Sequence, residues 1–236
     1  MRAIRVAVVD SGWDRSIADA RIDPGVGLID DASADFSAAW SDDDRDRHGH
    51  GTACADIILR VAPTARIVPV RVFSSRLETS PGLLIAAIEW AVAQHIPVIN
   101  LSLGTERADV LAASYAACDS ARRAGTIIVA AAGANPGHSF PAIFDPVIGV
   151  AAATLADRFG ILFRPDDALE CAACGVQWAR GLGGVERWFA GSSFAAPVVS
   201  GVIANFLEQE RGADLGDVRH MLARHAAVGA MRRSGV

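Results

Sequence analysis

Short apolar runs that fit β-strands alternate with helix-length stretches along most of this chain. The runs are continuously apolar rather than alternating with polar residues, which is typical of strands buried on both faces of a sheet. We predict strands at residues 4–9, 66–73, 98–101, 126–132 and 147–151, and helices at residues 51–60, 81–94, 107–123, 193–211 and 215–227. This alternation predicts an α/β fold of three layers, with a mostly parallel central sheet and helices on both faces.

Residues 13–47 read as polar and irregular. Pro69 falls inside the predicted strand at residues 66–73, although proline lacks the N–H that a central strand donates. The sequence shows no internal repeat, low-complexity segment or linker. We therefore predict that residues 1–236 form a single domain.

The composition excludes several classes of protein. The chain is 51% hydrophobic and 21% charged, which indicates a folded globule rather than a disordered segment. Its net charge of −5 argues against a nucleic-acid partner or an anionic membrane surface. No apolar run reaches the roughly 18–20 residues that a membrane-spanning helix needs. No loop has calcium-ligand spacing, so we expect neither a metal nor a cofactor.

The first predicted strand begins almost directly after Met1. This leaves no separate apolar segment and cleavage site of the kind that a secretory signal peptide has, and no evident pro-domain. The chain is then either a trimmed form or a protein that is made and used in the cytoplasm, and Met1 favours the second. We expect a cytoplasmic protein.

The four cysteines are expected to be reduced in that compartment. Cys171 and Cys174 form a Cys-x-x-Cys pair, but a zinc site usually needs a second ligand pair, which the sequence lacks. Silent thiols are favoured there over a local disulfide or a metal site. Cys54 follows His50 by one helical turn, and it also reads as a small apolar core residue.

Three segments carry the residue types of a nucleophilic triad. Asp10 ends the first predicted strand within Val-Val-Asp-Ser-Gly, and His50 opens a predicted helix within His-Gly-Thr. Ser193 lies in Gly-Ser-Ser-Phe-Ala-Ala-Pro, just before an apolar helix. A serine hydroxyl becomes a good nucleophile when a base takes its proton, and a carboxylate orients that base. We predict Ser193 as nucleophile, His50 as base and Asp10 as the orienting carboxylate.

Each of these residues has an alternative interpretation. Ser193 also fits a plain helix cap, and Asp10 also fits a capping residue at a turn, with Asp14 as a weaker candidate for its catalytic role. His48 is the rival of His50. Residues two apart do not share a helix face, and only His50 is followed directly by Gly-Thr, so His50 is favoured.

The three segments resemble the aspartate, histidine and serine segments of the subtilisin-like serine peptidases, and they occur in that family's order. A fourth segment at residues 100–104, Asn-Leu-Ser-Leu-Gly, resembles the family's substrate-binding strand end. The resemblance covers nearly the whole chain except residues 13–47 and 156–188. It implies the family's subtilisin-like fold and peptide-bond cleavage through an acyl-enzyme.

The resemblance also implies a peptide or protein substrate, which binds as an extended strand along Ser102, Leu103 and Gly104. The alternative for these residues is a simple turn at a strand end. The acidic run at residues 42–44 could hold basic side chains of a substrate, but a solvated loop is favoured because arginines interleave with the acids.

The oxyanion segment departs from the family pattern Ala-Ala-Gly-Asn-x-Gly. Residues 130–137 read Ala-Ala-Ala-Gly-Ala-Asn-Pro-Gly. Alignment on the strand puts Ala134 at the Asn position, whereas alignment on Asn-x-Gly puts Asn135 there. We favour Asn135 as the oxyanion donor, because a loop absorbs one extra residue more easily than the site loses a donor. A turn-forming Asn before proline is the alternative.

The function that these observations favour is a cytoplasmic serine endopeptidase that processes peptides, for example by trimming a leader peptide. A peptide-binding pseudo-protease and a general degradative protease are the alternatives. The sequence predicts no oligomeric state.

Overall fold

A computed structural model describes residues 3–30, 38–73 and 77–234 of the chain. Within these residues the main sheet has nine strands in the order β3-β2-β4-β1-β5-β6-β7-β9-β8. The strands are β1 (Arg5–Asp10), β2 (Val26–Asp30), β3 (Ala38–Ser41), β4 (Arg66–Arg71), β5 (Val98–Leu101), β6 (Ile127–Ala131), β7 (Val147–Ala153), β8 (Ile161–Phe163) and β9 (Cys171–Cys174). A separate hairpin pairs β10 (Val176–Arg180) with β11 (Glu186–Ala190).

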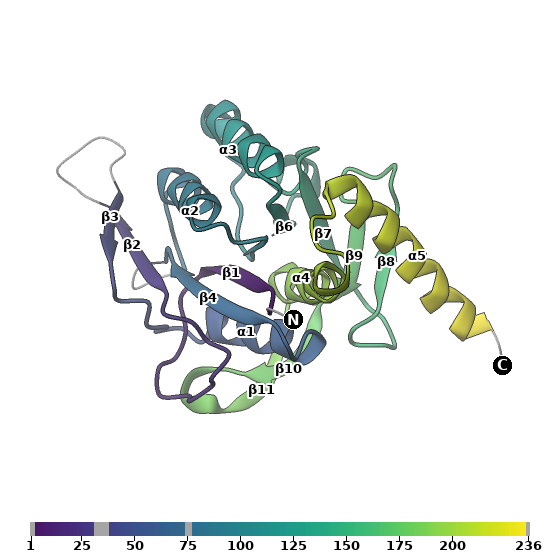
Figure 1. Ribbon diagram of the computed structural model, residues 1–236, viewed down its shortest axis with the longest axis horizontal. Coiled ribbons are helices and arrows are strands. Elements are labelled where there is room, and N and C mark those ends of the chain that lie inside the picture. Colours follow the sequence, from purple (N-terminus) through teal and green to yellow (C-terminus); the bar gives the residue numbers. More distant parts are fainter. Residues whose placement is uncertain (1–2, 31–37, 74–76, 235–236) are drawn as a thin grey trace.

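The helices form the two outer layers of a three-layer fold (Figure 1). They are α1 (His50–Val61), α2 (Pro81–Ala93), α3 (Leu111–Arg123), α4 (Ser192–Gln209) and α5 (Leu215–Ser234), with short turns η1 (Ala108–Val110), η2 (Pro136–His138) and η3 (Leu182–Gly184). Side chains of α1, α4 and α5 share one hydrophobic core, and those of α2 and α3 share the other. These two cores lie on opposite faces of the sheet and confirm the predicted architecture.

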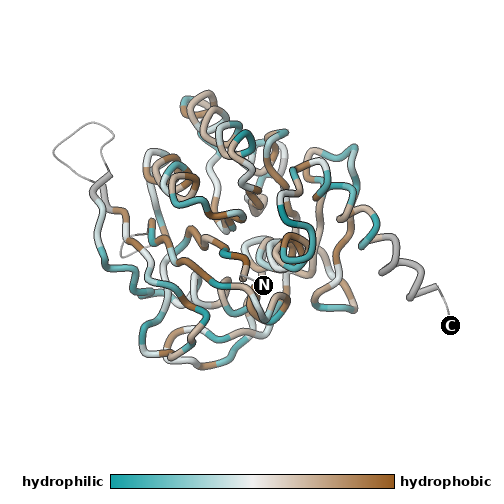
Figure 2. Tube along the Cα trace, viewed as in Figure 1, coloured by the Kyte–Doolittle hydropathy of each residue, from teal (hydrophilic) through white to brown (hydrophobic). Residues whose placement is uncertain are grey.

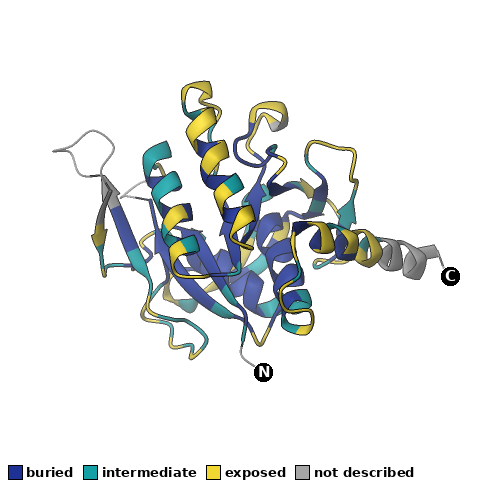
Figure 3. Cartoon of the chain, turned by 45° about the horizontal axis from the view of Figure 1, so that its top comes forward, coloured by how far each residue is buried: buried dark blue, intermediate teal, exposed yellow. Residues whose placement is uncertain are grey.

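The central strands are parallel, and antiparallel pairs occur at the two edges, β2 with β3 and β8 with β9. The central strands are brown in Figure 2 and dark blue in Figure 3, because both of their faces are covered by helices. This arrangement explains the continuously apolar runs in the sequence. None of the described helices is long and apolar enough to cross a membrane.

The prediction that residues 13–47 are irregular is wrong in part, because this segment contains β2 and β3. Both strands are short and lie at one edge of the sheet, where few partners impose a periodic pattern. Residues 31–37 of the segment lie outside the described residues. No strand was predicted in residues 156–188 either, where the structure has β8, β9, β10 and the start of β11.

Pro69 lies within β4, as the apolar run predicts, although β4 is an interior strand. Two residues earlier, the backbone N–H of Ile67 donates to Arg21 O, on the side of β4 that faces β2. The nitrogen of Pro69 points to that same side, and β2 begins to pair with β4 only at Val70. Proline is tolerated here because this nitrogen faces no ladder acceptor.

A partly buried ion pair fixes the hairpin β10–β11 to α1. The Asp56 carboxylate of α1 accepts hydrogen bonds from Arg180 Nε at 2.6 Å and from Arg180 N at 3.0 Å. It also accepts one from Arg60 Nε at 2.7 Å, and its side chain is 3% exposed. The hairpin leads directly into α4, so this contact helps to place the start of that helix.

Asp56→Ala should lower the free energy of unfolding by about 3 kcal/mol, because the partly buried Arg180 guanidinium loses its carboxylate partner. Urea unfolding followed by circular dichroism measures this change. Asp119→Ala is the matched control, since Asp119 pairs with Arg122 and Arg123 on the exposed side of α3. Its loss should cost less than about 1 kcal/mol. Equal costs for the two variants would contradict the role assigned to Asp56.

Candidate active site

Three elements bring the predicted triad residues to the carboxyl edge of the sheet. Asp10 is the last residue of β1, His50 is the first of α1, and Ser193 is the second of α4. The start of α1 lies very close to the end of β1, since a Cβ placed on Gly51 would come within 2.5 Å of Gly12 O. Only glycine at position 51 permits this approach.

Asp46 caps the start of α1, and sequence analysis missed it. Its buried carboxylate accepts hydrogen bonds from Thr52 N at 2.9 Å and from Thr52 Oγ1 at 2.7 Å. It also accepts from the backbone N–H groups of His48 and Gly49. The first helical N–H groups have no partner within their own helix, so a side chain that accepts from them stabilises the first turn. Asp46 thereby holds the backbone that carries His50.

The structure pairs Asp10 with His50. His50 Nδ1 lies 2.8 Å from Asp10 Oδ1 and 2.9 Å from Asp10 Oδ2. Asp10 is fully buried, and its carboxylate also accepts from Ser11 N at 2.7 Å. A carboxylate only accepts hydrogen bonds, so Nδ1 carries the proton and Nε2 of a neutral ring is left to accept one.

Burial lowers the pKa of His50, but the adjacent Asp10 carboxylate outweighs this effect and raises the pKa above its ordinary value. Cys54 Sγ lies 4.0 Å from His50 Nδ1. Burial and the Asp10 charge raise the pKa of Cys54, so this residue is a neutral thiol. A neutral, fully buried thiol is a poor nucleophile, and Cys54 therefore does not compete with Ser193.

His50 and Ser193 line the same cavity, which has a volume of about 380 Å³. The Ser193 hydroxyl donates to Ser102 O at 3.2 Å. Within the described residues, no hydrogen bond joins His50 to this hydroxyl. Catalytic hydrogen bonds are often incomplete without substrate. The predicted interaction between His50 and the Ser193 hydroxyl therefore stays a prediction.

Buried polar groups under Ser193 fix the start of α4. Ser200 Oγ donates to Asn100 Oδ1 at 2.9 Å, and Asn100 Nδ2 donates to Ser102 Oγ at 2.9 Å. Ser102 Oγ in turn donates to Ser193 O at 2.8 Å. Ser200 was not predicted to have a role, and Asn100 was noted only as part of the segment at residues 100–104. The signal that could have found them is a polar side chain inside an apolar strand or helix.

The predicted substrate-binding residues Ser102, Leu103 and Gly104 all line the cavity that contains Ser193. Leu103 and Gly104 also line a second cavity of about 440 Å³. Glu78, which is exposed, borders both cavities. Together the two cavities form a hollow along the chain segment that follows β5.

Asn135 does not line the cavity that His50 and Ser193 share. It is exposed at the start of η2, and its backbone carbonyl accepts from His138 N at 3.1 Å. Its side-chain amide has no hydrogen-bond partner within the described residues, and it does not line the cavity of Ser193. Ala134 is exposed as well. The choice between these two residues stays a prediction.

The alternative acidic residues have structural contacts elsewhere. Asp14 accepts from Gly183 N at 2.6 Å and lies outside the triad. The predicted solvated loop at residues 42–44 is wrong for Asp44, which is 3% exposed. Asp44 accepts from Gly25 N and pairs with Arg15. This acid therefore holds the loop together.

The Cys-x-x-Cys pair does not form a joint site. Cys171 and Cys174 lie in β9, and all four cysteines of the chain are free thiols. Residues three apart in a strand point to opposite faces. The two thiols therefore cannot bind one metal ion or form a local disulfide without disrupting β9.

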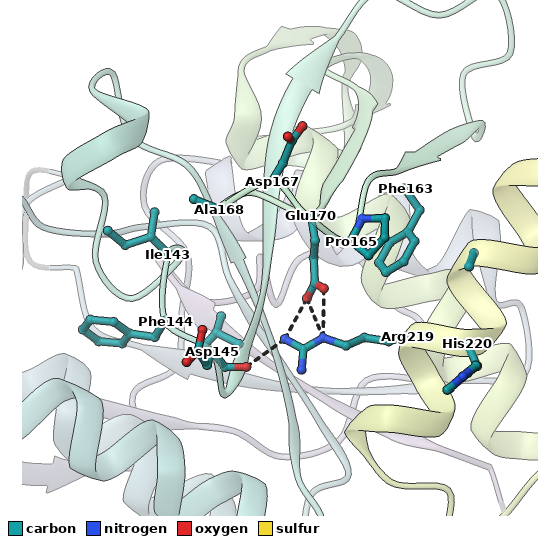
Figure 4. Close-up of a pocket in the computed structure, with 12 residues that line it drawn as sticks. Ile143, Phe144, Asp145, Phe163, Pro165, Asp167, Ala168, Glu170, Arg219 and His220 are labelled. Carbon is teal, nitrogen blue, oxygen red and sulfur yellow. Dashed lines mark hydrogen bonds and ion pairs between the residues drawn. The ribbon is translucent and has the colours of Figure 1, made fainter.

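A cavity of about 650 Å³ lies away from the triad, between α5 and the segments around β8 (Figure 4). Arg219 crosses it and pairs with the buried Glu170, and Arg219 also donates to Asp145 O at 2.7 Å. None of Asp10, His50 and Ser193 lines this cavity. Size alone does not identify the catalytic site in this protein.

Comparison with known families matches residues 1–235 to the subtilase family. The chain belongs to this family, which comprises the subtilisin-like serine peptidases. Subtilisin of Bacillus pumilus is 30% identical over 223 residues, which are 87% of this chain and 77% of that protein. Subtilisin E of Bacillus subtilis (strain 168) is also 30% identical, and the chain spans only 56% of its length.

Two solved protease structures confirm the fold. A cold-adapted subtilisin-like serine proteinase has a TM-score of 0.73 at 24% identity, over 94% of this chain and 81% of that one. A lanthipeptide protease has a TM-score of 0.72 at 20% identity, over 93% of this chain and 78% of that one. The predicted subtilisin-like fold is therefore confirmed.

Asp10→Asn should lower the pKa of His50 by about one to three, because the variant removes the charge that favours the imidazolium. NMR titration of the His50 ring protons measures both values. The wild-type pKa is expected above the ordinary value of about 6.5. His50 then becomes neutral, and competent as a base, only at a higher pH than an ordinary histidine. An unchanged pKa in the variant would contradict the electrostatic role of Asp10.

Proposed function

We propose that this protein is a serine endopeptidase that cleaves peptides bound as extended strands. The observation that carries the proposal is that Asp10 pairs with His50, and that His50 and Ser193 line the same cavity. Membership of the subtilase family supports it.

The proposed reaction begins when His50 Nε2 takes the proton of Ser193 Oγ, which attacks the peptide carbonyl carbon. The resulting oxyanion accepts hydrogen bonds from the backbone N–H of Ser193, at the positive end of α4, and from Asn135. His50 then gives its proton to the leaving amine as the C–N bond breaks. A water molecule, deprotonated by His50, releases the acyl group and restores Ser193.

Gly191 gives the start of α4 the geometry that this step requires. Its φ angle of 137° lies in a region that favours glycine, and it turns the chain from β11 directly into α4. The N–H of Ser193 is one of the first helical donors, which have no partner inside the helix. The donor is therefore available to a developing oxyanion.

We propose that the substrate backbone pairs with residues 102–104 by strand addition and that its upstream side chains enter the two cavities along this segment. We further propose that the enzyme processes peptides in the cytoplasm, for example by trimming a leader. The free thiols fit a reducing compartment. A lanthipeptide protease has a similar fold.

Two alternative functions, a pseudo-protease and a degradative protease, can be distinguished from the proposed one by experiment. Exposure of Asn135, away from the cavity of Ser193, favours a pseudo-protease that binds a peptide without cutting it. A degradative protease would cut an unfolded protein at many unrelated sites. Digestion of casein, followed by mass spectrometry of the products, distinguishes these cases, because a pseudo-protease produces no fragments.

Ser193→Ala should lower kcat by about 10⁴-fold or more, since it removes the attacking oxygen, and it should leave the fold intact. Hydrolysis of a fluorogenic peptide measures the loss. His50→Ala should be about as damaging. His48→Ala is its control and should retain most activity, because His50 and not His48 contacts Asp10. The reverse ranking of the two histidines would refute the assignment of the base.

Asn135→Ala should slow turnover by about 10²–10³-fold, equivalent to about 3–4 kcal/mol, if its amide turns to the oxyanion in the complex. KM should change little, because the donor acts mainly when the oxyanion forms. Single-turnover kinetics with an ester substrate separate the two effects. A silent variant would mean that Ala134 occupies the donor position and that backbone N–H groups alone bind the oxyanion.

A further inference from the structure

The start of α4 lies between the ends of two neighbouring strands. On one side Ser193 Oγ donates to Ser102 O, just beyond β5. On the other side Ser192 Oγ donates to Ala132 O at 2.5 Å, just beyond β6. The space between these two strand ends therefore borders the reacting serine directly. A substrate side chain next to the attacked carbonyl would have to enter this space.

Two glycines face this space, and the Ser139 hydroxyl lies between them. A Cβ placed on Gly133 would lie 3.2 Å from Ser139 Oγ, and one placed on Gly104 would lie 3.6 Å from the same atom. Gly104 is further confined by Phe140 O, 2.9 Å from such a Cβ. Glycines leave room between two strands, and here a side chain of the protein itself takes up that room.

Ser139 is held firmly in this position. Its hydroxyl accepts from Gly133 N at 2.5 Å, and the residue is 1% exposed. The adjacent Phe140 exchanges two backbone hydrogen bonds with Thr105, of 2.8 and 2.9 Å. The Phe140 ring is buried and stacks on Phe144. Moving Ser139 aside would break contacts on both sides of the segment.

The cavity of about 380 Å³ that borders Ser193 does not extend into the space between Gly104 and Gly133. Among the described residues, its lining comes from Phe73, residues 77–79 and residues 102–104 together with His50 and Ser193, and neither Gly133 nor Ser139 contributes to it. This cavity therefore has room for substrate side chains upstream of the cleaved bond. The residue at the cut meets the filled space between Gly104 and Gly133.

We propose that Ser139 closes the slot for the side chain of the residue whose carbonyl is attacked, and that the enzyme therefore cuts after glycine or alanine. This inference rests on the proposed peptidase function. Larger side chains would have to displace a buried hydroxyl together with its hydrogen bond to Gly133 N. A single additional methylene in a fitted pocket changes kcat/KM by about 10–200-fold.

The test uses fluorogenic peptides that differ only in the residue before the cut, namely glycine, alanine, leucine or phenylalanine. Wild-type kcat/KM should be at least about tenfold higher for alanine than for leucine or phenylalanine. Ser139→Gly should raise the ratio of kcat/KM for the leucine peptide to that for the alanine peptide about tenfold or more. His138→Ala is the control, because His138 is an exposed neighbour, and it should keep the wild-type preference.

Ser139→Thr is the second variant, and it keeps the hydroxyl while it adds a methyl group to the slot. It should weaken cleavage after alanine more than cleavage after glycine, even if Ser139→Gly fails to fold. Equal wild-type cleavage after phenylalanine and alanine would overturn the slot and leave the peptidase function intact. If the protein hydrolysed neither the peptides nor casein, both the slot and the peptidase function would be overturned.

Discussion

The contact between the start of α1 and the end of β1 is the constraint on which the rest of the site depends. Gly51 packs against Gly12 O with no room for a side chain, and the buried Asp46 carboxylate fixes the first turn of α1. Only with this contact does the His50 ring reach the Asp10 carboxylate. The Asp10 charge is buried, and burial of a carboxylate is tolerated when hydrogen-bond donors surround it, which His50 and the Ser11 N–H provide. The same buried contacts therefore set the geometry of the Asp10–His50 pair and stabilise the start of α1.

The nucleophile is placed by a separate set of interactions. A buried chain of hydrogen bonds from Ser200 through Asn100 and Ser102 ends on the carbonyl of Ser193. Every side chain in it has a partner, and a fully satisfied polar network rigidifies its surroundings. The ion pair between Asp56 and Arg180 holds the hairpin that precedes α4. The base and the nucleophile thus come from elements that are anchored independently, and they meet only at the carboxyl edge of the sheet.

The sequence predicted the parts of the fold whose pattern is dictated by burial. The central strands are covered on both faces, so their apolar runs are unbroken, and the residue that follows each run marks the edge where the site lies. The edge strands β3 and β8 are short and carry little periodic signal, so they were missed. Asp46 and Ser139 were missed for another reason. Both act from loops through backbone contacts, and no spacing in the sequence reveals where a loop side chain points.

The central claim is that the Asp10–His50 pair activates Ser193 in particular. Treatment of the folded protein with diisopropyl fluorophosphate, followed by proteolysis and mass spectrometry, tests this claim most directly, because the reagent modifies activated serines and requires no knowledge of the substrate. The account predicts one stoichiometric label on Ser193, which is lost in the His50→Ala variant. An unlabelled protein, or a label on Ser192 or Ser102 instead, would contradict it.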